Sequence, residues 1–92
     1  MLKQPEALDA LYTALISLKT KEECEKFLED LCTKPELHSL AQRWSVAKLL
    51  HEGKTFNEIM TEVGASSATI SRVNRSLVYG SGGYRDMLEK QK

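Results

Sequence analysis

Apolar residues recur at helical spacing along nearly the whole chain. Near the N-terminus the spacing i, i+3, i+4, i+7 is met by Leu8, Leu11, Tyr12 and Leu15. The same template fits Cys24, Phe27, Leu28 and Leu31. It continues through Leu37, Leu40, Ala41, Trp44, Ala47 and Leu50. No segment alternates apolar and polar residues with the period of two that marks a strand, so the pattern predicts an all-α protein.

Residues that typically begin or end helices divide this pattern into six helical segments. Two Thr-x-x-Glu sequences have the form of a capping box, Thr20 with Glu23 and Thr55 with Glu58. Other helix starts are predicted at Pro5, at Pro35 with Thr33 before it, at Ser66 or Ser67, and near Tyr84. Glycines predict the ends, at Gly53, Gly64 and Gly80-Ser-Gly-Gly83. We therefore expect six helices joined by short turns.

The stretch from Phe56 to Arg75 has the pattern of a helix-turn-helix. A tight turn between two short helices favours a residue with positive φ, and Gly64 stands at that point, followed by the small Ala65. The residues expected to face inward before the turn are Phe56, Ile59, Met60 and Val63. After the turn they are Ile70, Val73 and Leu77. Apolar contacts between these two sets would lock the helices together.

The second helix of this motif is predicted to have an outward face that is small, polar and basic. At about 100° per residue, the positions opposite the apolar stripe are Ala68, Ser71, Arg72 and Arg75, with Thr69, Asn74 and Ser76 at the edges. Arginine pairs with guanine through two hydrogen bonds, and alanine or threonine methyls contact the thymine methyl. We expect base contacts from Ala68, Thr69, Ser71, Arg72 and Arg75. Phosphate contacts are expected from Ser66, Ser67, Asn57 and Lys54.

Charge is balanced overall but unevenly placed along the chain. The 92 residues include 13 basic and 13 acidic side chains, for a net charge of zero. Residues 1–32 hold seven acids against four bases, whereas Val63 to Arg85 holds three arginines and no acid. That acid-free stretch includes the second helix of the motif and offers a local field that attracts a polyanion. Double-stranded DNA is the partner that these features predict.

A chain of this length forms one domain. Within it we expect dimerisation helices over 1–53, the helix-turn-helix over 55–79, and a C-terminal turn and helix over 80–92. Leu8, Leu11 and Leu15 lie on one side of the first helix, and Ile16 and Leu18 extend its apolar surface. A monomer's surface helix needs only one apolar stripe, so the surplus predicts a homodimer. The alternative is that the first two helices pack on later helices of the same chain.

The remaining side chains suggest neither catalysis nor metal binding. His38 and His51 have no carboxylate or cysteine at ligand spacing, and Cys24 and Cys32 match no zinc pattern. No nucleophile–base pair is evident, so we expect neither an enzyme nor a cofactor. No apolar run is long enough to cross a bilayer, and two reduced thiols fit a cytoplasmic protein. Because double-stranded DNA is the predicted partner, we expect the protein to associate with the bacterial nucleoid.

The segments LLHEGKTFNEIMTEVGAS and ATISRVNRSL resemble the Trp repressor family. Within it, LAQRW and YGSGGY are similar to the small Trp-repressor-like proteins called YerC/YecD. The resemblance rests on Leu40, Arg43, Leu50, Gly53, Gly64, Ala65, Ala68, Thr69, Ile70, Arg72 and Leu77. It implies a six-helix fold, an intertwined homodimer, and two recognition helices that occupy an operator and most simply repress transcription. Asn57 and Met60 replace an arginine and a lysine of the family, which weakens the expected phosphate contacts.

The resemblance also implies a candidate effector pocket at Gln42, Arg43 and Arg72. In the Trp repressor a threonine and two arginines help to hold tryptophan, and the matching residues here are Gln42, Glu52 and Arg72. Glu52 would repel the carboxylate of tryptophan, and Val73 replaces a glycine there. We expect no response to tryptophan, and either an unidentified small-molecule effector or none. Two alternatives stay open: a helix-turn-helix that binds proteins, and a sensor whose pocket is the main site.

Overall fold

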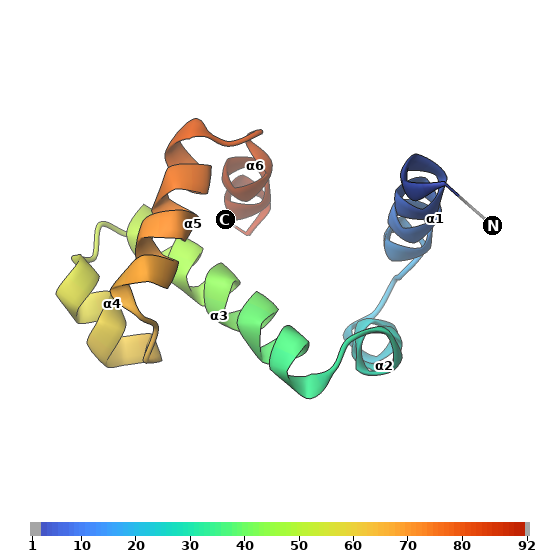
Figure 1. Cartoon of the computed structure of the whole chain (residues 1–92), viewed down its shortest axis with the longest axis horizontal. Coiled ribbons are helices and arrows are strands. Elements are labelled where there is room, and N and C mark those ends of the chain that lie inside the picture. The colour runs from blue at the N-terminus through green and yellow to red at the C-terminus, as the bar shows by residue number, and fades with distance from the viewer. Residues whose placement is uncertain (1–2, 92) are drawn as a thin grey trace. The chain divides into compact units, whose positions relative to one another are not determined.

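The computed structural model describes residues 3–91, and its regular structure is entirely helical. The elements are α1 (Gln4–Ile16), α2 (Lys21–Leu31), α3 (Lys34–His51), α4 (Phe56–Val63), α5 (Ser67–Tyr79) and α6 (Gly83–Lys90) (Figure 1). Short turns join them, so the predicted all-α, six-helix fold is confirmed. The chain forms two compact units, one up to Leu37 and one from His38 onward.

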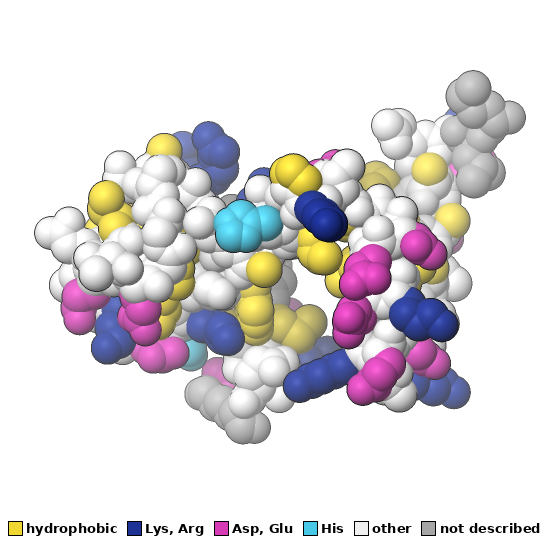
Figure 2. Space-filling view, turned by 90° about the horizontal axis from the view of Figure 1, so that it is seen from below, with side chains coloured by type: hydrophobic (Ala, Val, Ile, Leu, Met, Phe, Trp, Pro, Cys, Tyr) yellow, Lys and Arg dark blue, Asp and Glu magenta, His cyan; other side chains and the backbone are white. Residues whose placement is uncertain are grey.

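The first unit contains α1 and α2, and neither helix has a buried residue. The side chain of Ile16 is 84% exposed, and the apolar side chains of Leu8, Tyr12 and Leu15 are exposed as well. Acidic side chains gather over α2 (Figure 2), where the sequence places Glu22, Glu23, Glu25, Glu29 and Asp30. The apolar side chains of these two helices are therefore exposed or half-buried, and none is buried.

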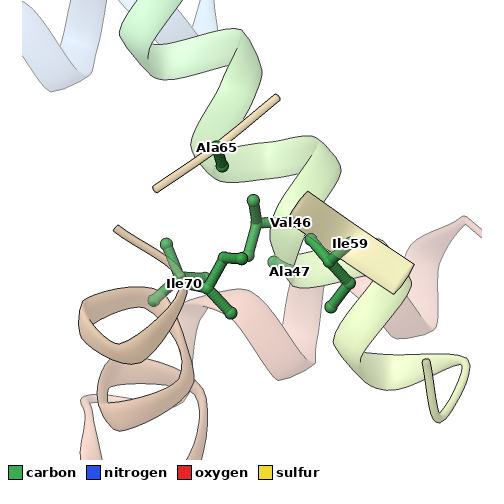
Figure 3. Packing of buried hydrophobic residues seen from close by; sticks show 6 residues of the cluster. Val46, Ala47, Ile59, Ala65 and Ile70 are labelled. Atoms are coloured by element: carbon green, nitrogen blue, oxygen red, sulfur yellow. The ribbon is translucent and has the colours of Figure 1, made fainter. Parts of the chain in front are cut away.

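The second unit contains the hydrophobic core. Six buried residues from α3, α4, the following turn and α5 form it: Val46, Ala47, Ile59, Ala65, Ile70 and Val73. Figure 3 shows the side chains of Val46, Ile59 and Ile70 converging between these elements. Leu88 of α6 is also buried, at 5% exposure. The core therefore fixes the two helices of the predicted motif against the C-terminal half of α3.

The prediction that Phe56 and Met60 face inward is wrong. Phe56 is 37% exposed and Met60 is 39% exposed, whereas Ile59 is fully buried. With only eight residues, α4 makes about two turns, and its covered stripe is narrow. Met60 lies about 100° around the helix from Ile59 and therefore falls at the edge of that stripe.

Capping boxes begin α3 and α4. The Thr55 hydroxyl accepts from the Glu58 N–H at 3.2 Å, and the Glu58 carboxylate accepts from the Thr55 N–H at 2.9 Å, as predicted. Thr33 and Glu36 form the same pair, which the sequence analysis missed. Hydrogen bonds from the threonine backbone and side chain lower the pKa of both glutamates below the ordinary 4.5. Their stabilising effect is therefore complete above about pH 4.5 and is lost as acid protonates the carboxylates.

The box predicted at the start of α2 forms with a shift of one residue. The Thr20 hydroxyl accepts from the Glu23 N–H at 3.1 Å, as expected of an N-cap. The Glu23 carboxylate, however, accepts from the Lys19 N–H at 2.7 Å rather than from Thr20. Both bonds still satisfy donors at the helix start.

Candidate nucleic-acid interface

A left-handed glycine joins α4 to α5. Gly64 has φ +69°, and its N–H donates to the Met60 carbonyl at 2.9 Å, which ends α4. Ala65 follows and is only 4% exposed. Ile59 from α4 and Ile70 from α5 meet beneath the turn in the core. The two helices therefore have the arrangement of a helix-turn-helix.

Replacing Gly64 with alanine tests the conformation of this turn. An added Cβ would meet no atom within 4 Å, so the penalty comes from the positive φ alone. We expect the free energy of unfolding to fall by about 1–2 kcal/mol, measured by urea denaturation. Gly83→Ala is the control, because Gly83 has no positive φ and a Cβ added there would meet only the Ser81 hydroxyl, at an ordinary contact distance of 3.8 Å. Equal destabilisation by the two substitutions would contradict this account.

The outward face of α5 is exposed to solvent, as the sequence predicted. The side chains of Ala68, Ser71, Arg72 and Arg75 are all exposed. On the opposite face, Ile70 and Val73 are buried. Thr69 is half-buried at the boundary between the two faces. No acid interrupts the sequence from Ser67 to Tyr79, so the face presents short polar groups and two guanidinium groups.

The first turn of α5 distinguishes the two serines expected to contact phosphate. Ser66 is the N-cap, and its hydroxyl oxygen accepts from the Thr69 N–H at 3.2 Å. The same hydroxyl donates to the Thr69 hydroxyl at 3.1 Å. Ser67 is the first helical residue, and its side chain is exposed. Ser66 is therefore engaged in the cap, and Ser67 presents the more accessible hydroxyl at this helix end.

Two further side chains of the predicted interface are exposed at the start of α4. Lys54 and Asn57, both expected near phosphate, are exposed on either side of the Thr55 cap. The carboxylates of Glu58 and Glu62 are exposed on the same short helix. Positive potential toward a polyanion is therefore concentrated on α5 rather than spread over both helices.

The three residues of the candidate effector pocket line one hollow of about 460 Å³ in the second unit. Gln42 and Arg43 reach it from α3, and Arg72 reaches it from α5. Its other lining residues are Ser39, Thr69, Val73, Ser76 and Tyr84. Sequence reasoning missed Ser39 and Tyr84 as lining residues, although Ser39 precedes Arg43 by one helical turn on α3. Glu52, beyond the end of α3, is not among the lining residues.

Residues 3–91 contain neither a cluster of metal ligands nor a helix that could span a membrane. No group of three or more His, Cys, Asp or Glu residues is placed there to hold a metal ion. Cys24 and Cys32 are free and half-buried. None of the described helices combines the length and the hydropathy needed to cross a membrane.

Comparison with known proteins agrees with this architecture. The family model described as Trp repressor protein matches residues 6–92. The uncharacterized protein YerC of Bacillus subtilis (strain 168) is 53% identical over 85 residues, which cover 92% of this chain and 82% of that protein. A candidate Trp repressor from Staphylococcus aureus superimposes with a TM-score of 0.90 at 48% identity, covering 92% of this chain and 85% of that one. A TrpR-like protein from Eubacterium eligens ATCC 27750 gives a TM-score of 0.89 at 49% identity, covering 92% and 88%. The chain therefore belongs to the Trp repressor family.

Proposed function

We propose that this protein is a sequence-specific regulator of transcription that binds double-stranded DNA through α5. The observation that carries the proposal is the outward face of α5, which is exposed, free of acids and held by a helix-turn-helix core. Family membership supports a helix-turn-helix regulator rather than an enzyme. The protein acts at DNA in the bacterial cytoplasm, and its simplest effect is repression by occupying an operator.

Each part of the proposed interface has a distinct task. Arg75 and Arg72 offer the guanidinium groups that read guanine in the major groove. Methyl groups of Ala68 and Thr69, and the Ser71 hydroxyl, complete the contacts to base edges. Ser66, Ser67, Asn57 and Lys54 line the rim toward the phosphates, where backbone N–H groups at the start of α5 assist. Base contacts give specificity in this arrangement, and phosphate contacts fix the register.

The DNA-binding form is a homodimer. Exposed apolar side chains on α1 and half-buried ones on α2 support pairing of the segment 1–53 with a second copy. The helix-turn-helix over 55–79 and the C-terminal turn and helix over 80–92 then complete each half. Two recognition helices related by a two-fold axis require half-sites about 34–36 Å apart. The operator is therefore a two-fold-symmetric sequence.

The hollow beside α5 supports a second candidate function, the sensing of a small molecule. Gln42, Arg43 and Arg72 line it, and no carboxylate does. Two guanidinium groups suit an anionic ligand better than a cationic one. We propose that tryptophan is not the ligand, because Gln42 and Val73 line the hollow where the family has a threonine and a glycine. Glu52 stands where the family has one of its two arginines and lies outside the lining, so that cation is missing from the hollow. A ligand-dependent rise in Tm with no DNA selectivity would favour the sensor over the regulator.

The test is selection of duplexes bound from fragments of the genome that encodes the protein. Fluorescence anisotropy on the selected duplexes follows, at low and near-physiological salt. We expect enrichment of a two-fold-symmetric site whose affinity survives salt better than that of random DNA. Added tryptophan should leave that affinity unchanged, and a tenfold tightening would overturn the pocket argument. Binding that shows no enriched site at either salt concentration would count against the regulator and favour a protein-binding module.

A further inference from the structure

The two ends of α5 are held by different helices. Its N-terminal end is fixed by the turn at Gly64 and by the contacts of α4. Its C-terminal end passes through a glycine-rich turn into α6, and α5 and α6 pack together (Figure 1). The Arg85 guanidinium, through Nη2, donates to the Val78 carbonyl in the last turn of α5 at 3.2 Å. The direction of α5 therefore depends on where α6 is anchored.

An aromatic stack anchors α6 to α3. The rings of Trp44 on α3 and Tyr84 on α6 are stacked, with centroids 6.5 Å apart and planes 14° from parallel. Both side chains are half-buried and pack against the core that includes Val46 and Ile70. Trp44 is the only tryptophan of the chain. The stack therefore joins two helices that are far apart in the sequence. It packs against the core that includes Ile70 and Val73 of α5.

The hollow makes this anchor more important for α5. Thr69, Arg72 and Ser76 of α5 border the open space of about 460 Å³. Tyr84 forms another part of the same wall. Because side chains next to an unfilled space make fewer contacts, α5 has less resistance to tilting there. The constraint from α6 then limits that tilt.

We propose that Tyr84 is a positioning residue for DNA recognition. Its stack on Trp44 fixes α6 on α3, and the bond from Arg85 to the Val78 carbonyl transmits that position to the recognition helix. The inference rests on the proposed function of α5. Contacts to base edges require a defined helix direction, whereas the electrostatic attraction to phosphates is independent of sequence and is spread over many charges. Loss of the stack therefore reduces discrimination between sequences more than it reduces general DNA affinity.

The main test compares Tyr84→Leu with wild type on a selected duplex and on a scrambled one, by fluorescence anisotropy. We expect a roughly three- to tenfold loss of affinity for the selected duplex, the scale of an aromatic pair. Affinity for the scrambled duplex should stay within about twofold. The near-UV circular dichroism of Trp44 should change in the same variant. Tyr84→Phe keeps the ring and should restore both signals.

Two further variants control the experiment. Tyr79→Leu removes a tyrosine that is 83% exposed near the same turn, and it should leave discrimination and the Trp44 signal unchanged. Arg85→Gln removes the bond to Val78 without altering the core, and it should weaken discrimination in the same direction. This variant decides the question if Tyr84→Leu fails to fold.

The outcomes separate this inference from the proposed function. Wild-type discrimination retained in both Tyr84→Leu and Arg85→Gln would overturn the positioning role alone. An equal loss of affinity for both duplexes would also overturn it. Wild-type protein that does not distinguish the two duplexes would overturn the proposed function, and the positioning role with it.

Discussion

Replacement of Ile59 by alanine is expected to lower the free energy of unfolding by about 2–5 kcal/mol. Ile59 is fully buried, with 0% of its surface exposed to solvent, where α4 meets α3 and α5. Removing three carbons there leaves a cavity that rigid neighbouring helices fill only in part. A small domain has a total stability of about 5–15 kcal/mol, so the loss is a large share. Urea denaturation, monitored by circular dichroism at a fixed protein concentration, measures this change in the free energy of unfolding.

The adjacent residue provides the control for this prediction. Met60 is 39% exposed on the same short helix, so Met60→Ala removes a similar volume at the edge of the core. We expect that change to stay below about 1 kcal/mol, since alanine also favours a helix. Similar losses for the two substitutions would show that α4 is not packed as described.

Arg75→Ala is expected to weaken binding to a selected duplex by about 1–3 kcal/mol, or roughly five- to 150-fold. Arg75 is exposed on the outward face of α5, beside Arg72 and Ser71. Removing a guanidinium that pairs with guanine leaves that base edge without its partner and relaxes specificity at one position. Fluorescence anisotropy against the selected duplex and single-base variants of it gives both quantities.

Two other substitutions separate base reading from simple charge. Arg75→Lys keeps the positive charge but loses the planar guanidinium that can donate two parallel hydrogen bonds to guanine. It should therefore reduce specific affinity while preserving the salt dependence of binding. Lys90→Ala removes a positive charge from the last turn of α6 and should have little effect on specificity. Unchanged affinity in Arg75→Ala would mean that α5 does not read the DNA.

Features set by nearby residues were predicted best from the sequence. The Thr55–Glu58 box and the left-handed Gly64 depend on a few adjacent positions, and both form as predicted. The outward face of α5 follows from the rotation of a regular helix, which a single strong apolar stripe is enough to orient. The resemblance to a family added Gln42, Arg43 and Arg72, and the structure places all three around one hollow.

Features set by distant residues were not predictable in the same way. Phe56 and Met60 fit an apolar pattern, but the width of the covered stripe depends on which helices pack against α4. The stack of Trp44 on Tyr84 joins positions separated by forty residues, and no periodicity within one helix relates them. The choice of Ser66 over Ser67 as N-cap likewise depends on the φ and ψ that the preceding turn imposes.

The absence of any buried residue in α1 and α2 has a thermodynamic consequence. Helices of 13 and 11 residues are marginal in water without tertiary contacts, so their order depends on whatever covers their apolar side chains. If a second copy supplies that cover, as proposed above, ordering of this segment and association are one equilibrium, governed by mass action. The melting temperature then rises with protein concentration, and the amount of the protein in a cell sets how much of it is fully folded.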